Sequence, residues 1–259
     1  MEKIHLTFDD GPHQNNTPRI LDTLEKYKIK ATFFVLGERI KAKGELLKRM
    51  TAEGHRVGNH TFNHKNLTTL ADRDVINEIT STERAISQHM NPDFILRPPY
   101  GSRNSRINKI IESLGYTIVL WDVDSEDWKR KPDGWIDYGV NQINRRKESL
   151  VLMHDIHSTT AAGLSTFIEK IRNAGGTFCD LESVINIPAP GGSSGEGHAP
   201  GRRYHRVVAG ETLSSISLKC YKTTSRWRAI YEANDSQIDN PDVIHAGLRL
   251  IIPRVRQLT

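Results

Sequence analysis

Residues 4–12 read Ile-His-Leu-Thr-Phe-Asp-Asp-Gly-Pro, a short run rich in apolar residues that ends in two aspartates and a turn signal. Such a run before Gly-Pro is typical of a buried strand. Thr17 and Pro18 then predict a helix start, because Thr caps helices and Pro is tolerated at the first helical position. A second apolar run follows at residues 31–36. This order of strand, helix and strand predicts the first unit of a parallel sheet.

The same alternation continues through the next part of the chain. Further strands are predicted at residues 56–59, 94–97, 117–121, 150–153 and 177–179. Helical periodicity fits residues 40–52, 72–89, 104–113, 134–146 and 161–173. Repeated alternation of strand and helix predicts an α/β fold with a parallel sheet, here a distorted (β/α) barrel of about seven strands that is closed or nearly closed.

A change of composition divides the chain. Residues 187–201 are rich in Gly, Pro and Ser, and they contain almost no large apolar side chains. Such a segment cannot bury enough surface to order itself, so it is expected to be a flexible linker. The predicted organisation is therefore a large domain at residues 1–186, a linker at residues 187–203 and a small domain at residues 204–259.

The small domain has an extended start and an extended end with two short helices between them. Thr212 is expected to cap the first helix, and Trp227, Ile230 and Tyr231 fall on one face of the second. This pattern predicts a small α+β unit of strand–helix–helix–strand order. In a unit of about 50 residues most of the apolar positions must form the core.

Composition excludes some classes of protein. The 259 residues are 37% hydrophobic and 26% charged, as in an ordinary water-soluble protein, and no apolar run approaches the length of a membrane span. The net charge of +5 comes from residues 200–259, which hold 10 Lys or Arg and 5 Asp or Glu. A basic small domain favours an anionic surface such as a bacterial wall, and no recognition motif supports nucleic acid. Cys179 and Cys220 are too few to predict a disulfide framework or a zinc cluster.

Polar residues follow the predicted strands at their carboxyl ends. In a β/α barrel these ends meet on one face, where active sites are built. Each residue alone has an ordinary structural explanation, such as a turn for Asp-Asp-Gly-Pro, and the placement on successive strand ends is what predicts a site. The residues are Asp9, Asp10, His60, His64, Arg97, Asp124 and His154.

This set fits a catalytic metal centre. His60 and His64 are four residues apart, so a helical turn would place both imidazoles on one side, and one carboxylate of Asp9 and Asp10 would complete three ligands. Three protein ligands leave positions open for water and substrate. The other aspartate is then expected to act as a general base and His154 as a general acid.

Two further residues would adjust the acid and the base. Asp124 is placed to hydrogen-bond an imidazole and keep it charged, and Arg97 would hold the base aspartate ionised.

In sequence order, five segments resemble the motifs of the NodB-homology polysaccharide deacetylases, carbohydrate esterase family 4. They are Thr-Phe-Asp-Asp-Gly-Pro at residues 7–12, His-Thr-Phe-Asn-His at 60–64, Arg-Pro-Pro-Tyr-Gly at 97–101, Asp-Ser-Glu-Asp-Trp at 124–128 and Leu-Met-His at 152–154.

The resemblance implies a role for each motif residue. Asp9 would be the base, oriented by Arg97, while Asp10, His60 and His64 would bind Zn²⁺ or another divalent ion such as Co²⁺. In the remaining motifs, the Tyr100 backbone N–H would help to hold the oxyanion, and Asp124 would tune His154 as the acid. The methyl group of the acetyl would lie in a small apolar pocket formed by Trp128 and Leu152.

The small domain resembles a LysM domain, through residues 207–216, 227–234 and 247–253. That resemblance implies binding to N-acetylglucosamine in peptidoglycan or chitin, through the loops after the first strand and before the last. The implied groove residues are Gly210, Glu211, Thr212, Leu213, Asn240, Pro241, Asp242, Val243 and Ile244.

Together the two resemblances imply a monomeric, metal-dependent hydrolase that removes N-acetyl groups from N-acetylglucosamine residues of a polysaccharide and releases acetate. The LysM domain would hold it on peptidoglycan or chitin, either outside the cell or in the cell envelope, although the chain shows no signal peptide. Two alternatives remain open, namely a non-catalytic wall-binding or chitin-binding scaffold and a metal amidase or esterase that acts on a different acyl substrate.

Overall fold

The structure is a computed structural model that describes residues 2–185, 203–208, 210–235, 237–238, 240–245 and 248–253. The predicted linker lies outside this range except for its last residue, Arg203. Among the described residues, no helix combines the length and the apolar content that a membrane crossing requires.

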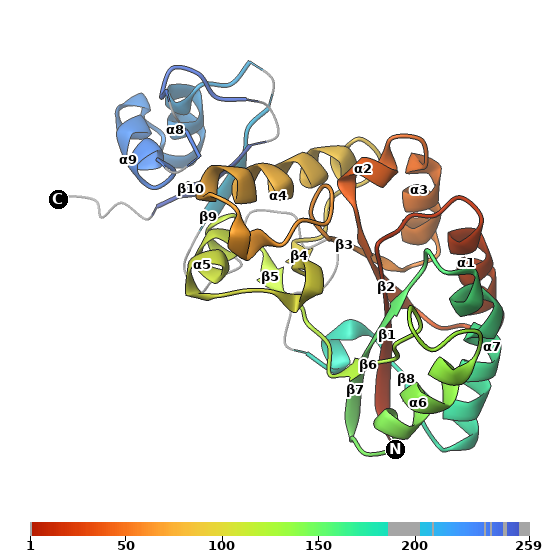
Figure 1. Cartoon of the computed structure of the whole chain (residues 1–259). Coiled ribbons are helices and arrows are strands. Elements are labelled where there is room, and N and C mark those ends of the chain that lie inside the picture. The colour runs from red at the N-terminus through yellow and green to blue at the C-terminus, as the bar shows by residue number, and fades with distance from the viewer. Residues whose placement is uncertain are drawn as a thin grey trace.

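The large domain is built on a parallel sheet whose central strand is β1, Lys3–Asp9. β1 pairs with β7 (Glu148–His154) along one edge, and with β2 (Ala31–Val35) and the short β8 (Thr177–Phe178) along the other. On the β2 side the sheet continues through β3 (Arg56–Asn59), β4 (Ile95–Leu96) and β5 (Thr117–Ile118), and on the β7 side it ends with β6 (Val123–Asp124). The sheet is curled, with β5 and β6 as its two ends, and forms a half-barrel, which confirms the predicted α/β class (Figure 1).

Helices cover the outside of the half-barrel. α6 packs on α7, α7 on α1, and α1 on α3, while α4 packs on α2 and α5 (Figure 1). Their bounds are α1 (Asn16–Tyr27), α2 (Gly37–Ile40), α3 (Gly44–Ala52), α4 (Asp72–Ser87), α5 (Ser105–Ser113), α6 (Gly134–Ile143) and α7 (Ser158–Asn173). Short 3₁₀ turns lie at Leu67–Thr69, Pro99–Gly101 and Leu181–Ser183.

The side chains of β1 alternate between two environments. Ile4, Leu6 and Phe8 belong to the main apolar core, which they share with residues of α1 and α7. Thr7 and Asp9 point to the opposite, inner face, where both contact Arg97. Because successive residues of a strand face opposite sides, one sequence builds the core and presents polar groups to the interior of the half-barrel.

Several details differ from the expectations. The predicted strand at residues 117–121 is shorter, because β5 ends at Ile118, and Asp124 belongs to a separate strand, β6, at the other end of the sheet. The predicted helix at residues 40–52 is two helices, α2 and α3. Thr17 does not cap α1, since the helix begins at Asn16 and the Thr17 hydroxyl donates to the Asp155 carboxylate instead. The backbone N–H of Asn16 donates to Nδ1 of His13, which takes over the capping role.

The small domain has the predicted order. Strands β9 (Arg203–Arg206) and β10 (Arg249–Ile252) pair in antiparallel fashion, and α8 (Leu213–Tyr221) and α9 (Trp227–Glu232) lie between them in sequence, with a 3₁₀ turn at Thr224–Arg226. Thr212 caps α8 in a reciprocal capping box with Ser215. Trp227, Ile230 and Tyr231 contribute to the apolar core, as their spacing predicts.

Candidate active site

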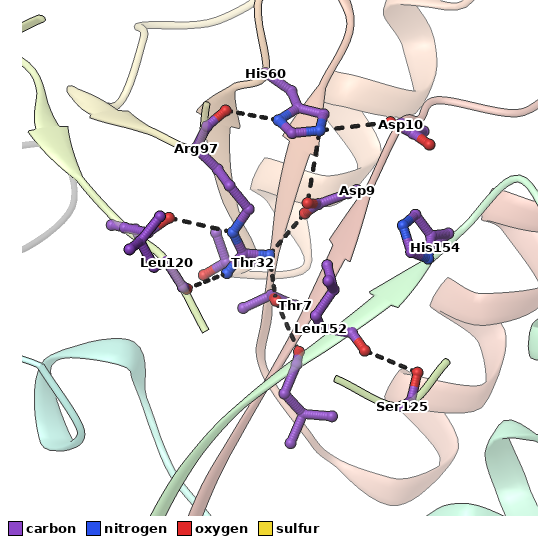
Figure 2. A network of polar contacts seen from close by, with 12 residues as sticks. Thr7, Asp9, Asp10, Thr32, His60, Arg97, Leu120, Ser125, Leu152 and His154 are labelled. Atoms are coloured by element: carbon purple, nitrogen blue, oxygen red, sulfur yellow. Dashed lines mark hydrogen bonds and ion pairs between the residues drawn. The ribbon is translucent and has the colours of Figure 1, made fainter. Parts of the chain in front are cut away.

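Polar side chains from three strands meet at the carboxyl end of the half-barrel. Asp9 is the last residue of β1, His60 follows β3 directly, and His154 is the last residue of β7. Figure 2 shows Asp9, Asp10 and His60 in contact, with His154 facing them from the neighbouring strand. The structure thus brings together the residues that were selected from separate strand ends.

Asp10 reaches the site because the backbone leaves the strand conformation at that residue. Continued alternation would send the side chains of Asp9 and Asp10 to opposite faces of the sheet. Asp10 instead has φ 72°, a left-handed conformation that is uncommon for residues other than glycine. Both carboxylates consequently approach the same imidazole, with His60 Nε2 at 3.6 Å from Asp9 Oδ2 and at 3.5 Å from Asp10 Oδ1.

Asp10, His60 and His64 form a cluster that can hold a metal ion. One ligand atom from each lies within 4.8 Å of the others, and His64 Nε2 is 3.4 Å from Asp10 Oδ1. Nδ1 of His60 is 2.7 Å from the carbonyl oxygen of Arg97, which can only accept a hydrogen bond. Nδ1 therefore carries the proton, and the lone pair of Nε2 faces the cluster.

The protonation states of the cluster suit a cation. Burial opposes the charge of Asp10, but its contact with His60 and the nearby histidines hold the pKa of its carboxyl well below the usual range. Burial lowers the pKa of His64, and the neighbouring His60 adds to this effect. Asp10 Oδ1 is buried and has no hydrogen-bond partner among the described residues, so the residues present fit a divalent ion that would satisfy it.

The two histidines are not on a helical turn, which corrects the expectation drawn from their spacing. Residues 60–64 form a loop in which Thr61 has φ 70° and His64 has φ 60°. These two left-handed residues fold the chain back, and the ring centroids of His60 and His64 lie 5.0 Å apart. The loop achieves the convergence that the helix was expected to provide.

Arg97 is completely buried and holds Asp9 in place. Its Nη1 donates to Asp9 Oδ1 and to Thr7 Oγ1, each at 2.7 Å (Figure 2). Nη2 and Nε donate to the carbonyl oxygens of Leu120 and Val119, and the guanidinium lies over the Phe34 ring at 4.2 Å. These contacts fix the orientation of the Asp9 carboxylate beside a buried guanidinium.

The residue that contacts His154 is Asp127 and not Asp124, which corrects the prediction for this pair. Asp127 Oδ1 lies 2.7 Å from His154 Nδ1, and Asp127 Oδ2 accepts from the backbone N–H of His154 and from the hydroxyl of Thr160. Burial alone would lower the pKa of His154, but the hydrogen bond and charge of Asp127 raise that pKa to about 9. His154 is therefore protonated at neutral pH.

Asp124 shapes the loop that delivers Asp127. Its Oδ1 accepts the backbone N–H of Glu126 at 2.9 Å, and Glu126 has φ 53°. Partial burial raises the pKa of the Asp124 carboxyl. Sequence reasoning missed Asp127 and Thr160, because three acidic residues lie within residues 124–127 and only the loop conformation decides which of them faces His154.

The remaining motif residues lie around this centre. Tyr100 has φ 60° and is 67% exposed, and its ring lies at a steep angle to the His64 ring with a centroid distance of 4.6 Å. Trp128 is 49% exposed. Leu152 is buried on β7 between Val151 and Met153, whose side chains belong to the main core. Tyr100 and Trp128 thus offer exposed aromatic surfaces, whereas Leu152 is covered.

Several predicted groove residues of the small domain have structural roles. The Glu211 carboxylate accepts from the Val208 backbone N–H, the His205 ring and Lys219, while Thr212 caps α8 and Leu213 is in the core. Gly210 has φ 86°, and Asn240 Oδ1 accepts from the backbone N–H of Asp242. Pro241 is partly exposed, Asp242 and Val243 are exposed, and Ile244 packs against the core.

A parallel half-barrel with a two-histidine, one-aspartate cluster beside His154 and Asp9 is an arrangement that can support hydrolysis assisted by a metal. Family models support this assignment, since the polysaccharide deacetylase model matches residues 1–119 and the LysM model matches residues 205–253. The chain belongs to the polysaccharide deacetylases of carbohydrate esterase family 4 and carries a LysM domain.

Three similar proteins illustrate the range of this family. The peptidoglycan-N-acetylglucosamine deacetylase PgdA of Listeria monocytogenes is 40% identical over 71% of this chain, which spans 39% of that protein. A solved T48 deacetylase with substrate has a TM-score of 0.65 and 38% identity, with 71% of this chain and 90% of that chain covered. BA3943 of Bacillus anthracis, a family pseudoenzyme, has a TM-score of 0.63 and 29% identity, with 71% and 65% covered.

Proposed function

We propose that this protein is a metal-dependent hydrolase that removes the N-acetyl groups of N-acetylglucosamine residues in peptidoglycan. The observation that carries the proposal is the placement of three functions at one end of the half-barrel. These are a carboxylate held by a buried arginine, the Asp10–His60–His64 cluster and a histidine kept protonated by Asp127. Because a pseudoenzyme has the same fold, this intact set supports activity more strongly than the fold does.

The Asp10–His60–His64 cluster would hold Zn²⁺ or another divalent ion such as Co²⁺. When bound there, such an ion supplies Lewis-acid polarisation of the acetyl carbonyl and of water. The chain contributes the geometry, because the Arg97 carbonyl fixes the tautomer of His60 and leaves Nε2 as the ligand atom.

Asp9 is the group that accepts a proton from the attacking water. Its Oδ1 is engaged by Arg97, whereas Oδ2 lies on the side of His60 and the cluster. The water oxygen forms a bond to the acetyl carbon, and Asp9 takes the proton that this water loses. Arg97 holds Asp9 in one orientation, with Oδ2 turned toward the cluster, so that it is placed to act as the base.

His154 supplies the proton that the other half of the reaction needs. The C–N bond of the amide breaks, and the sugar nitrogen leaves as an amine after it accepts this proton. Asp127 keeps His154 charged and fixes its ring, while Thr160 and the backbone N–H of His154 hold Asp127. The products are a glucosamine unit and acetate.

Three residues would complete the site. The left-handed conformation of Tyr100 supports the use of its backbone N–H for the developing oxyanion. Trp128 and Leu152 would enclose the acetyl methyl, one as an exposed aromatic wall and the other as a buried apolar base. If these two side chains leave room for only a methyl group, the site would favour acetyl over larger acyl groups.

The LysM domain and the named relatives support peptidoglycan as the polymer. A glycan held by residues of the 210–213 and 240–244 loops would raise the concentration of sugars near the large domain without new contacts at the active site. The basic charge of residues 200–259 favours an acidic wall polymer over neutral chitin. We therefore place the protein at the cell wall and retain chitin as the alternative substrate.

Acetate release tests the proposal. The full chain is incubated with N-acetylated peptidoglycan and, in parallel, with chito-oligosaccharides, after chelation and after re-addition of Zn²⁺. Zinc-dependent acetate release is expected, faster from peptidoglycan, and Asp9→Asn should remove it while zinc still binds. If no acetate appears with either glycan after Zn²⁺ or Co²⁺ is re-added while the protein still binds the glycan, it is a wall-binding scaffold and the proposal is wrong.

A further inference from the structure

The loop that carries His60 and His64 is held by hydrogen bonds from three directions. Asn59 Oδ1 accepts the backbone N–H of Thr61 at 2.8 Å. At the start of α2, the backbone N–H groups of Gly37 and Glu38 donate to the carbonyl oxygens of Thr61 and Phe62, each at 3.0 Å. The third set of hydrogen bonds comes from α4, which packs against β3, the strand that precedes the loop (Figure 1).

Glu78 of α4 makes the third set of contacts. Its Oε2 accepts the backbone N–H groups of Phe62 at 2.9 Å and of Asn63 at 3.1 Å. The Asn63 side-chain amide, with its nitrogen turned toward Glu78, adds a contact of 2.8 Å to Oε1, and Lys65 Nζ lies 3.5 Å from the same atom. One carboxylate therefore grips the two residues midway between the metal-binding histidines.

A buried carboxylate at this position needs an explanation. Glu78 is only 6% exposed, and burying a charge is unfavourable unless hydrogen bonds replace its hydration. The loop has a matching need, because Thr61 and His64 both adopt left-handed backbone conformations that a free loop would leave. Charge-assisted bonds to the N–H groups between these two residues hold the loop in that conformation.

We propose that Glu78 is a positioning residue for the metal site, which fixes the distance and orientation of His60 and His64 before a cation binds. The polar contacts of Glu78 with this loop are with Phe62, Asn63 and Lys65, so it would act on the histidines through the backbone between them. The inference rests on the proposed metal site and adds to it a carboxylate outside the family motifs quoted above. Outer groups that orient metal ligands affect metal affinity strongly.

Three variants of Glu78 separate geometry from charge. Glu78→Gln keeps an oxygen at the right distance, Glu78→Asp keeps the charge but shortens the reach, and Glu78→Ala removes both. Ile86→Val is the matched control, because Ile86 packs in the main core from the same helix and has no part in the loop. Zinc affinity of the full chain is measured by competition with a chromophoric chelator, and thermal unfolding of each metal-free variant is recorded beside it.

The expected order of zinc affinity is wild type, Glu78→Gln, Glu78→Asp and Glu78→Ala, with the last weakened on the order of 10–100-fold. Ile86→Val should lower the melting temperature and leave zinc affinity unchanged. Equal affinity in the wild type and Glu78→Ala would overturn this inference while leaving the metal site intact. A zinc loss in Ile86→Val equal to that in Glu78→Ala would also overturn it. If the wild type itself binds no zinc, the proposed metal site and this inference both fail.

Discussion

Asp127 Oδ1 lies 2.7 Å from Nδ1 of His154, and the two residues sit at the ends of neighbouring strands, one in the loop after β6 and the other closing β7. A buried carboxylate on one ring nitrogen leaves the other nitrogen of a charged imidazole free to give a proton. In the proposed reaction this pair would supply the acid, and its pH behaviour can be measured.

Asp127→Asn should lower kcat by about 10²–10⁴-fold, the usual contribution of general acid catalysis. The pKa of His154 is about 9, and as the acid it must be protonated, so wild-type activity should decline as the pH rises through this region. Without the Asp127 charge that pKa falls, and the alkaline limb of the pH profile moves to lower pH. A cation at the neighbouring cluster would move the alkaline limb to lower pH in both proteins. The effect of Asp127 is therefore the difference between the limb positions of the wild type and Asp127→Asn.

Asp124→Asn is the matched control for that measurement. Asp124 accepts the backbone N–H of Glu126, and an asparagine oxygen can accept it too. The control should therefore keep the position of the alkaline limb. If Asp124→Asn lowers kcat or shifts the alkaline limb more than Asp127→Asn does, then Asp124, and not Asp127, sets the pKa of His154, and the assignment is wrong.

Arg97→Met should destabilise the large domain by about 3–5 kcal/mol, because it leaves the buried Asp9 carboxylate without its partner. Asp9→Asn in the same protein removes that uncompensated charge, so the double variant should recover part of the loss. Urea unfolding of the wild type, the two single variants and the double variant gives the coupling energy. Strict additivity of the two changes would show that the pair is not coupled.

Asp155 gives the stability of the protein a pH dependence of its own. Burial raises the pKa of its carboxyl to about 7 from 3.8, so the folded state holds a proton that the unfolded state has lost. The free energy of unfolding should then fall as the pH rises from about 4 to about 7 and level off above it. Asp155→Asn has no such proton, and its melting temperature should gain on the wild type between pH 4 and pH 8. A constant difference over that range would contradict the assignment.

Glu211→Ala should weaken the small domain itself, by about 1–3 kcal/mol, because the carboxylate accepts the Val208 backbone N–H and contacts His205 and Lys219. As a control for that stability measurement, Val243→Ser changes an exposed side chain and should alter stability by less than about 0.5 kcal/mol.

Retention on insoluble peptidoglycan should fall in Val243→Ser if the 240–244 loop binds the glycan. Unchanged retention in this variant would remove Val243 from the groove.

The strand ends could be predicted from the sequence, because an apolar run, a polar residue after it and a helix beyond are each visible in the residue pattern. That reasoning placed Asp9, His60 and His154 at one end of the sheet, where the structure has them. It could also predict the two helices and two strands of the small domain, where Thr212 has a recognisable capping pattern.

What the sequence could not predict depends on left-handed residues that are not glycine. Asp10, Thr61 and Glu126 have φ of 72°, 70° and 53°, and each redirects a functional side chain at or just after it. Such conformations are uncommon for residues other than glycine, so their positions are not apparent from a single sequence. The spacing of His60 and His64 therefore predicts a helical turn where the chain has a loop, and the residue pattern does not distinguish Asp124 from Asp127.

The position of β1 has a consequence for how the protein loses activity on heating. β1 is paired along both edges and carries Asp9, so its amides should exchange with solvent only when the sheet as a whole comes apart. β6, by contrast, is a terminal strand with β7 as its neighbour, and the loop that follows it holds Asp127. Local opening should therefore begin at a terminal strand such as β6, and warming should then separate His154 from the Asp127 carboxylate that holds it while Asp9 and His60 are still in register.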